Sequence, residues 1–244
     1  MIAERSARSR LRRPPGLVVV GVILVAIFCV VAIRDFDYAR PRTSGPEMWV
    51  DVARETGAAN VVSSIYLGAR LFDTILEVLV FSVAALGVRF YLSARGRSYE
   101  AELVPESHIV RVAVGVLLPP ILLLGIYILS YGHLSPGGGF SGGVIGASGL
   151  LFAAISLGTT HVSQRMRPSV LRWMEWSVLF GLIALAVLPA AFSLPLLADP
   201  LPAGRMGSLM SGGSIPLYNG LIGLKVFIGA WIVIKHFVDH RGEI

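Results

Sequence analysis

The chain has 244 residues, of which 55% are hydrophobic and 15% are charged, and its mean hydropathy is +0.73. Soluble domains carry about 25% charged residues, so this composition excludes a water-soluble globular protein. The net charge of +6 is distributed between apolar blocks, which indicates membrane topology rather than nucleic-acid binding.

Apolar segments recur along the whole chain. A helix needs about 20 residues to cross a hydrocarbon core of about 30 Å. The sequence therefore predicts an all-α integral membrane protein with about six transmembrane helices. The last two segments exceed the minimum length, so we expect tilt or a kink at Pro189 or Pro195. The predicted spans are 16–33, 72–92, 109–131, 139–160, 170–198 and 216–238.

The N-terminal 15 residues are basic and precede the first apolar run. That run is longer than the roughly 7–15 apolar residues of a signal peptide, so 16–33 is interpreted as a retained helix. With six spans, the connecting segments place 14 Lys and Arg on one side and 5 on the other. Because basic residues stay in the cytoplasm, both termini are predicted to be cytoplasmic, in a multi-pass protein of the cell membrane.

Between the first two spans lies a segment of mixed character. Residues 60–68 are rich in β-branched side chains and too short to span a membrane. They predict either a short external strand or hairpin, or a helix lying on the surface. Pro41, Gly45 and Pro46 mark the loop before this segment.

A glycine cluster follows the third span. Gly137, Gly139 and Gly142 satisfy G-x-G-x-x-G, but a dinucleotide site also needs a preceding strand and an acidic residue about 20 positions later. Here an apolar span precedes the cluster and the next acid is Glu175, so no such site is expected. Small residues four apart instead predict a helix-packing surface whose unwound start is covered by protein. The motif comprises Pro136, Gly137, Gly138, Gly139, Gly142 and Gly143, and Gly139/Gly143 and Gly142/Gly146 are its small-residue pairs.

Ionisable residues inside spans are functional candidates because they are costly in lipid. Asp73 and Glu77 share one helical face, and Lys225 lies well inside the last span. One interpretation is a proton or cation path through these residues. The other is structural: Asp73 caps a helix start, Glu77 and Lys225 bond to neighbouring helices or subunits, and Glu175 pairs with Arg172.

The histidines and the cysteine give little sign of catalysis or metal binding. His133 precedes the glycine cluster and is either a hydrogen-bond partner of its backbone or a proton-transfer group. His236 and His240 have the spacing of two metal ligands, but no third ligand is apparent, so a cytoplasmic interfacial tail is favoured. A single Cys, Cys29, excludes a disulfide within the chain. No catalytic, metal or cofactor site is expected.

The glycine cluster resembles the hallmark of a known family. Residues 132–145, Gly-His-Leu-Ser-Pro-Gly-Gly-Gly-Phe-Ser-Gly-Gly-Val-Ile, are similar to the MnhB domain. That domain is the B subunit of Mrp-type multisubunit cation/proton antiporters and recurs in membrane-bound hydrogenases. The family usually has Gln where this chain has Ser141. Asn219 with 223–226 also resembles the family's last-helix motif, so the resemblance covers about 108–240.

A second resemblance lies upstream. Asn60-Val61-Val62 and the pattern Phe72, Asp73, Thr74 and Glu77 are similar to the MbhE subunit of membrane-bound hydrogenases, which corresponds to the C-terminal end of the Mrp A subunit. The two resemblances imply a fusion of neighbouring modules. Its parts are a basic cytoplasmic N-terminus (1–15), an MbhE-like module with two transmembrane helices (16–98) and an MnhB-like domain with four (99–244).

These resemblances imply an accessory membrane subunit of a Na⁺/H⁺ antiporter module. Other membrane subunits and the lipid bilayer would be its partners, and Na⁺ and H⁺ the transported ions. The chain would line an ion path around Asp73, Glu77 and Lys225, or act only as a scaffold. Two alternatives remain: a subunit of a membrane-bound hydrogenase or related redox-driven pump, and a small self-sufficient transporter. Paired broken helices would favour the last, but only one Gly/Pro-interrupted region is evident.

Overall fold

The computed structural model describes residues 26, 46–94, 108–157, 162 and 168–239. All of these except Ala26 belong to one compact unit, Arg42–Ile244. The regular elements in the described part of the chain are all helical, and no strand occurs there. They are α3 (Pro46–Thr56), α4 (Val61–Ser64), the π-helix η2 (Ile65–Ala69), α5 (Leu71–Ala94), α6 (His108–Ser130), α7 (Gly139–Leu157), α9 (Pro168–Ala191) and α10 (Ile215–Asp239).

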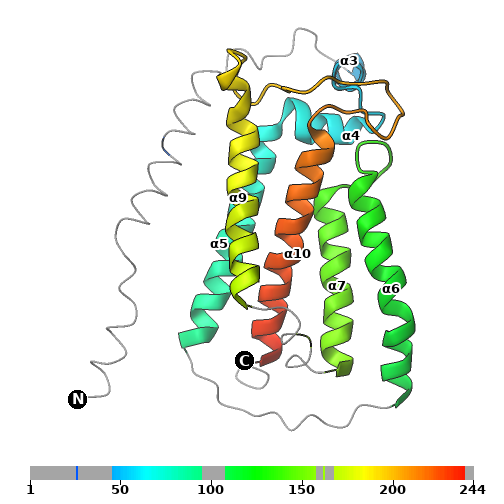
Figure 1. Cartoon of the computed structure of the whole chain (residues 1–244), viewed down its shortest axis with the longest axis vertical. Coiled ribbons are helices and arrows are strands. Elements are labelled where there is room, and N and C mark those ends of the chain that lie inside the picture. The colour runs from blue at the N-terminus through cyan, green and yellow to red at the C-terminus, as the bar shows by residue number, and fades with distance from the viewer. Residues whose placement is uncertain (1–25, 27–45, 95–107, 158–161, 163–167, 240–244) are drawn as a thin grey trace, which may run out of the picture. The chain divides into compact units, whose positions relative to one another are not determined.

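The long helices form a bundle around α10, which contacts α5, α6, α7 and α9 (Figure 1). Helices α6 and α7 are antiparallel neighbours joined by residues 131–138. That connection, the 192–214 connection, α3 and α4 all lie at one end of the bundle, which we call the loop end (Figure 1).

Four of these helices are long and apolar enough to cross a membrane: Leu71–Leu92, His108–Ser130, Ser169–Ala191 and Ile215–Val238. Helix α7 has a shorter apolar stretch, Gly139–Ala154, which is about 24 Å long at 1.5 Å per residue. The prediction of a helical protein with several membrane spans is therefore confirmed. The count of six stays a prediction, because nearly all of 16–33 lies outside the described residues.

Of the two alternatives for 60–68, the external strand or hairpin is wrong and the helix is right, because 61–69 are helical in α4 and η2. Asn60 precedes α4 in an extended conformation, and its side chain accepts hydrogen bonds from the backbone N–H groups of Val62 and Ser63. This cap satisfies N–H groups that the first helical turn leaves free. It starts a helix in spite of the β-branched residues that favoured a strand.

Helix α9 ends earlier than predicted, at Ala191 rather than 198. Pro189 lies in its last turn, where the backbone carbonyl of Pro189 accepts hydrogen bonds from Phe192 and Leu194. The chain then turns through Ser193 and Leu197, whose φ angles are 58° and 64°. Pro189 therefore marks the end of the helix, and Pro195 lies beyond it.

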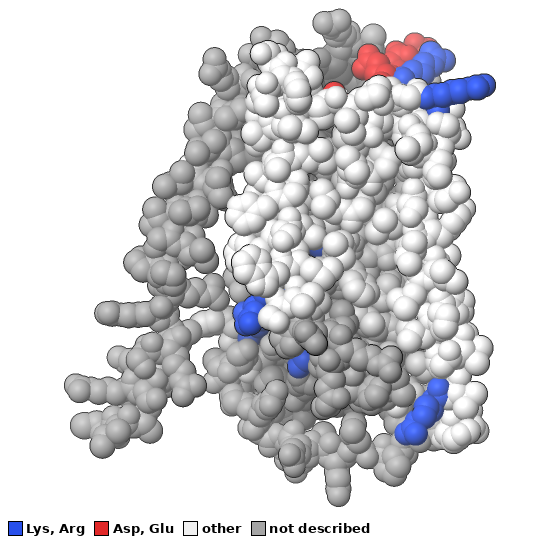
Figure 2. Space-filling view, viewed as in Figure 1, with Lys and Arg blue, Asp and Glu red and all other residues white. Residues whose placement is uncertain are grey.

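Charged side chains gather toward the two ends of the bundle, and the face between them is almost entirely uncharged (Figure 2). The middle of α6 contributes apolar side chains to this uncharged face: Val116, Leu123 and Ile126 are 67%, 66% and 61% exposed. Soluble proteins rarely expose contiguous apolar surface of this kind. The bundle therefore presents a belt suited to lipid or to other membrane helices.

Candidate functional site

The glycine cluster forms a turn and the first residues of α7. Gly137 and Gly138 have φ angles of 136° and 143°, which side-chain-bearing residues rarely adopt. Helix α7 begins at Gly139, three residues after Pro136. The sequence predicted Pro136 near this helix start. Of the irregular residues between them, Gly138 is buried against Tyr66 of η2 and Asn219 of α10, and Gly137 is half-buried beside Ile128 of α6.

Asn219 of α10 holds this turn in place. Its side-chain oxygen accepts a 2.9 Å hydrogen bond from the backbone N–H of Gly139 and a 3.1 Å bond from the Tyr66 hydroxyl of η2. Asn219 is fully buried, so its carbonyl replaces the water that the first N–H of α7 would otherwise need. Burial raises the pKa of the Tyr66 phenol, which keeps it protonated as a donor.

Asn60 fastens the same connection from the other side. Its side-chain nitrogen donates to the backbone carbonyls of Gly132 and Ser135, both at 2.8 Å, and its backbone N–H donates to the His133 carbonyl at 3.0 Å. One residue therefore caps α4 and binds the turn between α6 and α7. The site formed by Asn60, Tyr66, Asn219 and residues 132–139 is called the polar junction below.

The glycines of α7 pack on two helices, and a Cβ added at Gly146 would lie 3.0 Å from the Phe227 ring of α10. A Cβ atom added at Gly139 would lie 2.6 Å from the Asn219 carbonyl oxygen, and one at Gly143 would lie 2.6 Å from that of Gly223, so this pair packs on α10. At Gly142 it would lie 2.7 Å from the Gly125 carbonyl oxygen of α6. Backbones this close are typical of small-residue contacts between membrane helices.

His133 is buried beside the polar junction, with 1% of its surface exposed. Its ring lies near Gly212 in the connection before α10. Neither ring nitrogen has a hydrogen-bond partner within the described ranges. One sequence interpretation had the His133 ring hydrogen-bonded to the glycine backbone, and the structure does not show that bond. The backbone carbonyl of His133 instead accepts a hydrogen bond from the Asn60 N–H.

Lys225 forms an ion pair inside the bundle. Its ammonium group lies 2.7 Å from Oε1 of Glu175 on α9, and the two side chains are 2% and 19% exposed. Lys225 is ten residues into α10, about 15 Å from Ile215 along the axis. The predicted pairing of Glu175 with Arg172 is wrong, because Glu175 turns inward to Lys225.

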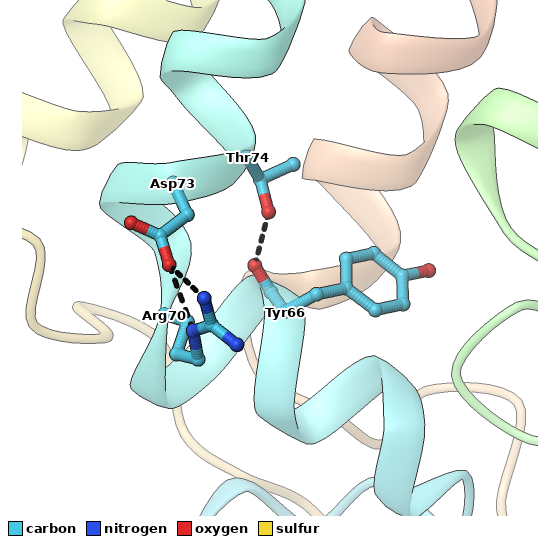
Figure 3. Close-up of polar contacts among 4 residues, drawn as sticks. All are labelled: Tyr66, Arg70, Asp73 and Thr74. Carbon is cyan, nitrogen blue, oxygen red and sulfur yellow. Dashed lines mark hydrogen bonds and ion pairs between the residues drawn. The ribbon is translucent and has the colours of Figure 1, made fainter.

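Asp73 lies in the first turn of α5 and pairs with Arg70 (Figure 3). The Asp73 carboxylate lies 2.7 Å from Nε and 2.6 Å from Nη2 of Arg70. Thr74 donates a 2.5 Å hydrogen bond to the Tyr66 carbonyl, which connects α5 to η2 (Figure 3). The helix start is therefore stabilised by an exposed ion pair and a buried hydroxyl.

Glu77 is one turn further along α5, on an exposed face. Within the described ranges it makes no hydrogen bond or ion pair, and neither a hydrogen bond nor an ion pair joins Asp73, Glu77 and Lys225 to one another. The predicted candidates thus fall into three settings: a surface pair, an exposed carboxylate and a buried pair.

Sequence reasoning missed the roles of Asn60, Tyr66 and Asn219 and the partner of Lys225. Asn219 carried a usable signal, because an amide inside an apolar helix needs a hydrogen-bond partner. Tyr66 carried none, since an aromatic residue beside a membrane helix is ordinary. Of the two tail histidines, His236 contacts the Ile232 carbonyl at 2.7 Å and His240 lies outside the described residues.

Comparison with known proteins identifies the family. A family model for domains related to the MnhB subunit of a Na⁺/H⁺ antiporter matches residues 109–232. The A/B subunit of a probable K⁺/H⁺ antiporter from Rhizobium meliloti (strain 1021) is 29% identical over 97% of this chain. The chain spans 26% of that relative's length.

Two solved structures share the fold. One is a chain of the membrane-bound sulfane sulfur reductase, an archaeal respiratory membrane complex, with a TM-score of 0.70 and 25% identity over 91% of this chain and 97% of that one. The other belongs to the Mrp complex from Dietzia sp. DQ12-45-1b, with a TM-score of 0.63 and 20% identity over 95% of this chain and 27% of that one. The chain is therefore a multi-pass membrane protein related to subunits of membrane complexes.

Proposed function

This chain belongs to the family of domains related to the MnhB subunit of a Na⁺/H⁺ antiporter, and from that premise we propose that it is an accessory membrane subunit of a multisubunit cation/proton antiporter module. The observation that carries the proposal is the extent of the family match. Residues 109–232 include nearly all of α6, α7, α9 and α10, the helices that form most of the bundle.

We also propose that the chain joins two modules, 16–98 and 99–244, in one polypeptide. The Rhizobium meliloti relative, whose name combines A and B subunits, aligns over 97% of this chain and so extends well upstream of the family match. The proposal includes six spans with both termini in the cytoplasm, supported by the ratio of 14 to 5 Lys and Arg on the two sides.

Glu77 and Lys225 are the residues we propose for an ion path, with Asp73 and His133 as further candidates. Glu77 is an exposed carboxylate in a membrane-spanning helix, and Lys225 is a buried cation near the middle of another. At the middle of a span a charge such as that of Lys225 costs about 2.5–3.5 kcal/mol, which favours a role beyond filling volume. Transported ions would be H⁺ and either Na⁺ or K⁺.

The test is cation/proton exchange in membrane vesicles from a host that lacks the chromosomal copy of this chain. Exchange is normalised to the amount of assembled complex in each preparation. Vesicles carrying Glu77→Gln, or the double variant Lys225→Met with Glu175→Gln, should show reduced Na⁺- or K⁺-dependent collapse of a pH gradient per assembled complex. The double variant removes both members of the ion pair, so no lone charge confounds the result. Normal exchange by both variants would leave the chain a scaffold.

A second candidate function is a subunit of a hydrogenase-type or other redox-driven membrane complex. The observation that favours it is the archaeal respiratory complex, whose chain aligns over 97% of its own length with this one. Purification of the tagged chain in mild detergent discriminates the two functions. Co-purifying antiporter subunits alone support the first, whereas co-purifying subunits with redox centres support the second.

A further inference from the structure

Helix α5 presents one side to the bundle and leaves the other uncovered. Its buried residues, among them Leu71, Ile75 and Val78, face α10 and η2. The opposite side is exposed at spacings of three and four residues, which places those residues on one helical face. This outer face of α5 comprises Asp73, Leu76, Glu77, Val80, Val83, Ala84, Gly87, Phe90 and Tyr91.

Glu77 distinguishes this face from an ordinary lipid-facing surface. It lies about 9 Å along the helix axis from Leu71, between the exposed side chains of Leu76 and Val80. Lipid tails offer no hydrogen-bond donor, so an ionised carboxylate at this depth needs a partner. The other carboxylates in the described membrane spans, Asp73 and Glu175, already pair within the chain.

The arginines within the described spans lie somewhat nearer the helix ends and have longer side chains than Glu77. Arg89, Arg111 and Arg172 are five, three and four residues from a helix end, whereas Glu77 is six residues from Leu71. Long basic side chains at such positions extend to the polar interface, whereas the shorter glutamate side chain cannot reach as far. Glu77 therefore requires a donor at its own depth.

The first apolar segment of this chain cannot supply that donor. Residues 16–33 contain no charged, amide or hydroxyl side chain, and Cys29 is their one weak donor. A second copy of this chain would bring a like charge if it used the same face. Neither the described residues nor 16–33 supply a donor to Glu77, so its charge fits a basic side chain from a different polypeptide.

We propose that the outer face of α5 binds a membrane-spanning helix of another subunit, and that a Lys or Arg of that helix pairs with Glu77. The small residues Ala84 and Gly87 lie two and three turns further along the same face, and a Cβ at Gly87 would meet nothing within 4 Å. They allow the partner's backbone to approach closely below the ion pair. This inference rests on the proposed role of the chain as a subunit of a larger complex.

The experiment uses the full chain expressed with the rest of its complex in native membranes. A photo-reactive amino acid at Val80 should form a cross-link to a membrane-spanning peptide of another subunit that contains Lys or Arg. The same probe at Leu124, an exposed residue six positions from the loop end of α6, as Glu77 is from that of α5, is a control that should not yield this peptide. A cross-link only to residues 16–33, to a second copy or to lipid overturns the proposal.

Variants that change the charge at residue 77 supply a second test of the proposal. Glu77→Lys and Glu77→Leu should each reduce recovery of the assembled complex by about tenfold or more, because each leaves the partner's cation buried and unpaired. Reversing the charge of the cross-linked Lys or Arg should restore assembly with Glu77→Lys. Asp51→Asn is a control away from this face and should assemble normally, since Asp51 is exposed on α3 and pairs with Arg54.

Two outcomes distinguish a failure of the proposed α5 interface from a failure of the proposed function. Full assembly of the Glu77→Leu variant shows that lipid covers the face, and it leaves the proposed role in a larger complex intact. Failure of the wild-type chain to co-purify with any membrane subunit contradicts the proposed function itself.

Discussion

Removing either member of the Lys225–Glu175 pair should destabilise the protein, and removing Glu175 should cost more than removing Lys225. Glu175→Gln leaves the Lys225 ammonium, which is 2% exposed, without its carboxylate. Breaking a buried pair in this way costs about 3–5 kcal/mol. Lys225→Met leaves Glu175, which is 19% exposed and better able to reach water, so its cost should lie toward the lower end of that range.

The double variant, Lys225→Met with Glu175→Gln, should recover most of the loss. It leaves no buried charge, and replacing a whole buried pair is often neutral. The two residues are therefore coupled, and the double-mutant cycle should give an interaction energy of at least about 2 kcal/mol. Because 1 kcal/mol shifts the melting temperature of a chain this size by about 2–4 °C, Glu175→Gln should lower it by about 6–20 °C.

The assay is the thermal stability of the purified complex, followed by size-exclusion chromatography of the tagged chain after heating. The four proteins of the cycle are compared in one detergent and at one pH. Equal stability of wild type and Glu175→Gln, or a double variant whose loss equals the sum of the single losses, would refute the buried pair.

The remaining predictions concern the polar junction, the glycine contacts and topology. Asn219→Leu removes the acceptor of a buried backbone N–H and should lower stability by about 1–3 kcal/mol in the same thermal assay. Gly143→Ala should reduce the yield of folded protein because its Cβ would lie 2.6 Å from a backbone oxygen of α10, whereas Gly115→Ala, with nothing within 4 Å, should fold normally. In a chain without Cys29, single cysteines at Met210 and Ser169 should react with impermeant thiol reagents from opposite sides of the membrane; labelling from one side would contradict the topology.

The helices were predictable because apolar length is a strong local signal. Lys225 was recognised as unusual for the same reason, since a charge inside an apolar segment stands out in the sequence. Its partner was not predictable. Glu175 is 50 residues away, and the choice between Lys225 and the neighbouring Arg172 depends on how α9 is rotated against α10.

At 60–68 the sequence left a strand and a surface helix open, for a different physical reason. β-branched residues favour strands only weakly, and the cap from Asn60 with its bonds to residues 132–135 outweighs that preference. Asn60 meets residues 132–135 only after the chain has folded, so the sequence alone does not show that the cap is supported by these bonds. The same applies to Asn219, whose place in a motif was evident but whose hydrogen bonds to Gly139 and Tyr66 were not.

The glycine contacts also restrict where ions can move through this chain. Near Gly142 and Gly143 the backbone of α7 lies directly against α6 on one side and α10 on the other. Helices in backbone contact leave no space between them for water or a hydrated cation. The ionisable candidates at membrane depth, Glu77 and the Lys225–Glu175 pair, instead lie on α5 and between α9 and α10. The ion path that we propose for Glu77 and Lys225 therefore lies on the α5 and α9 sides of the bundle and does not pass between α7 and its neighbours at Gly142 and Gly143.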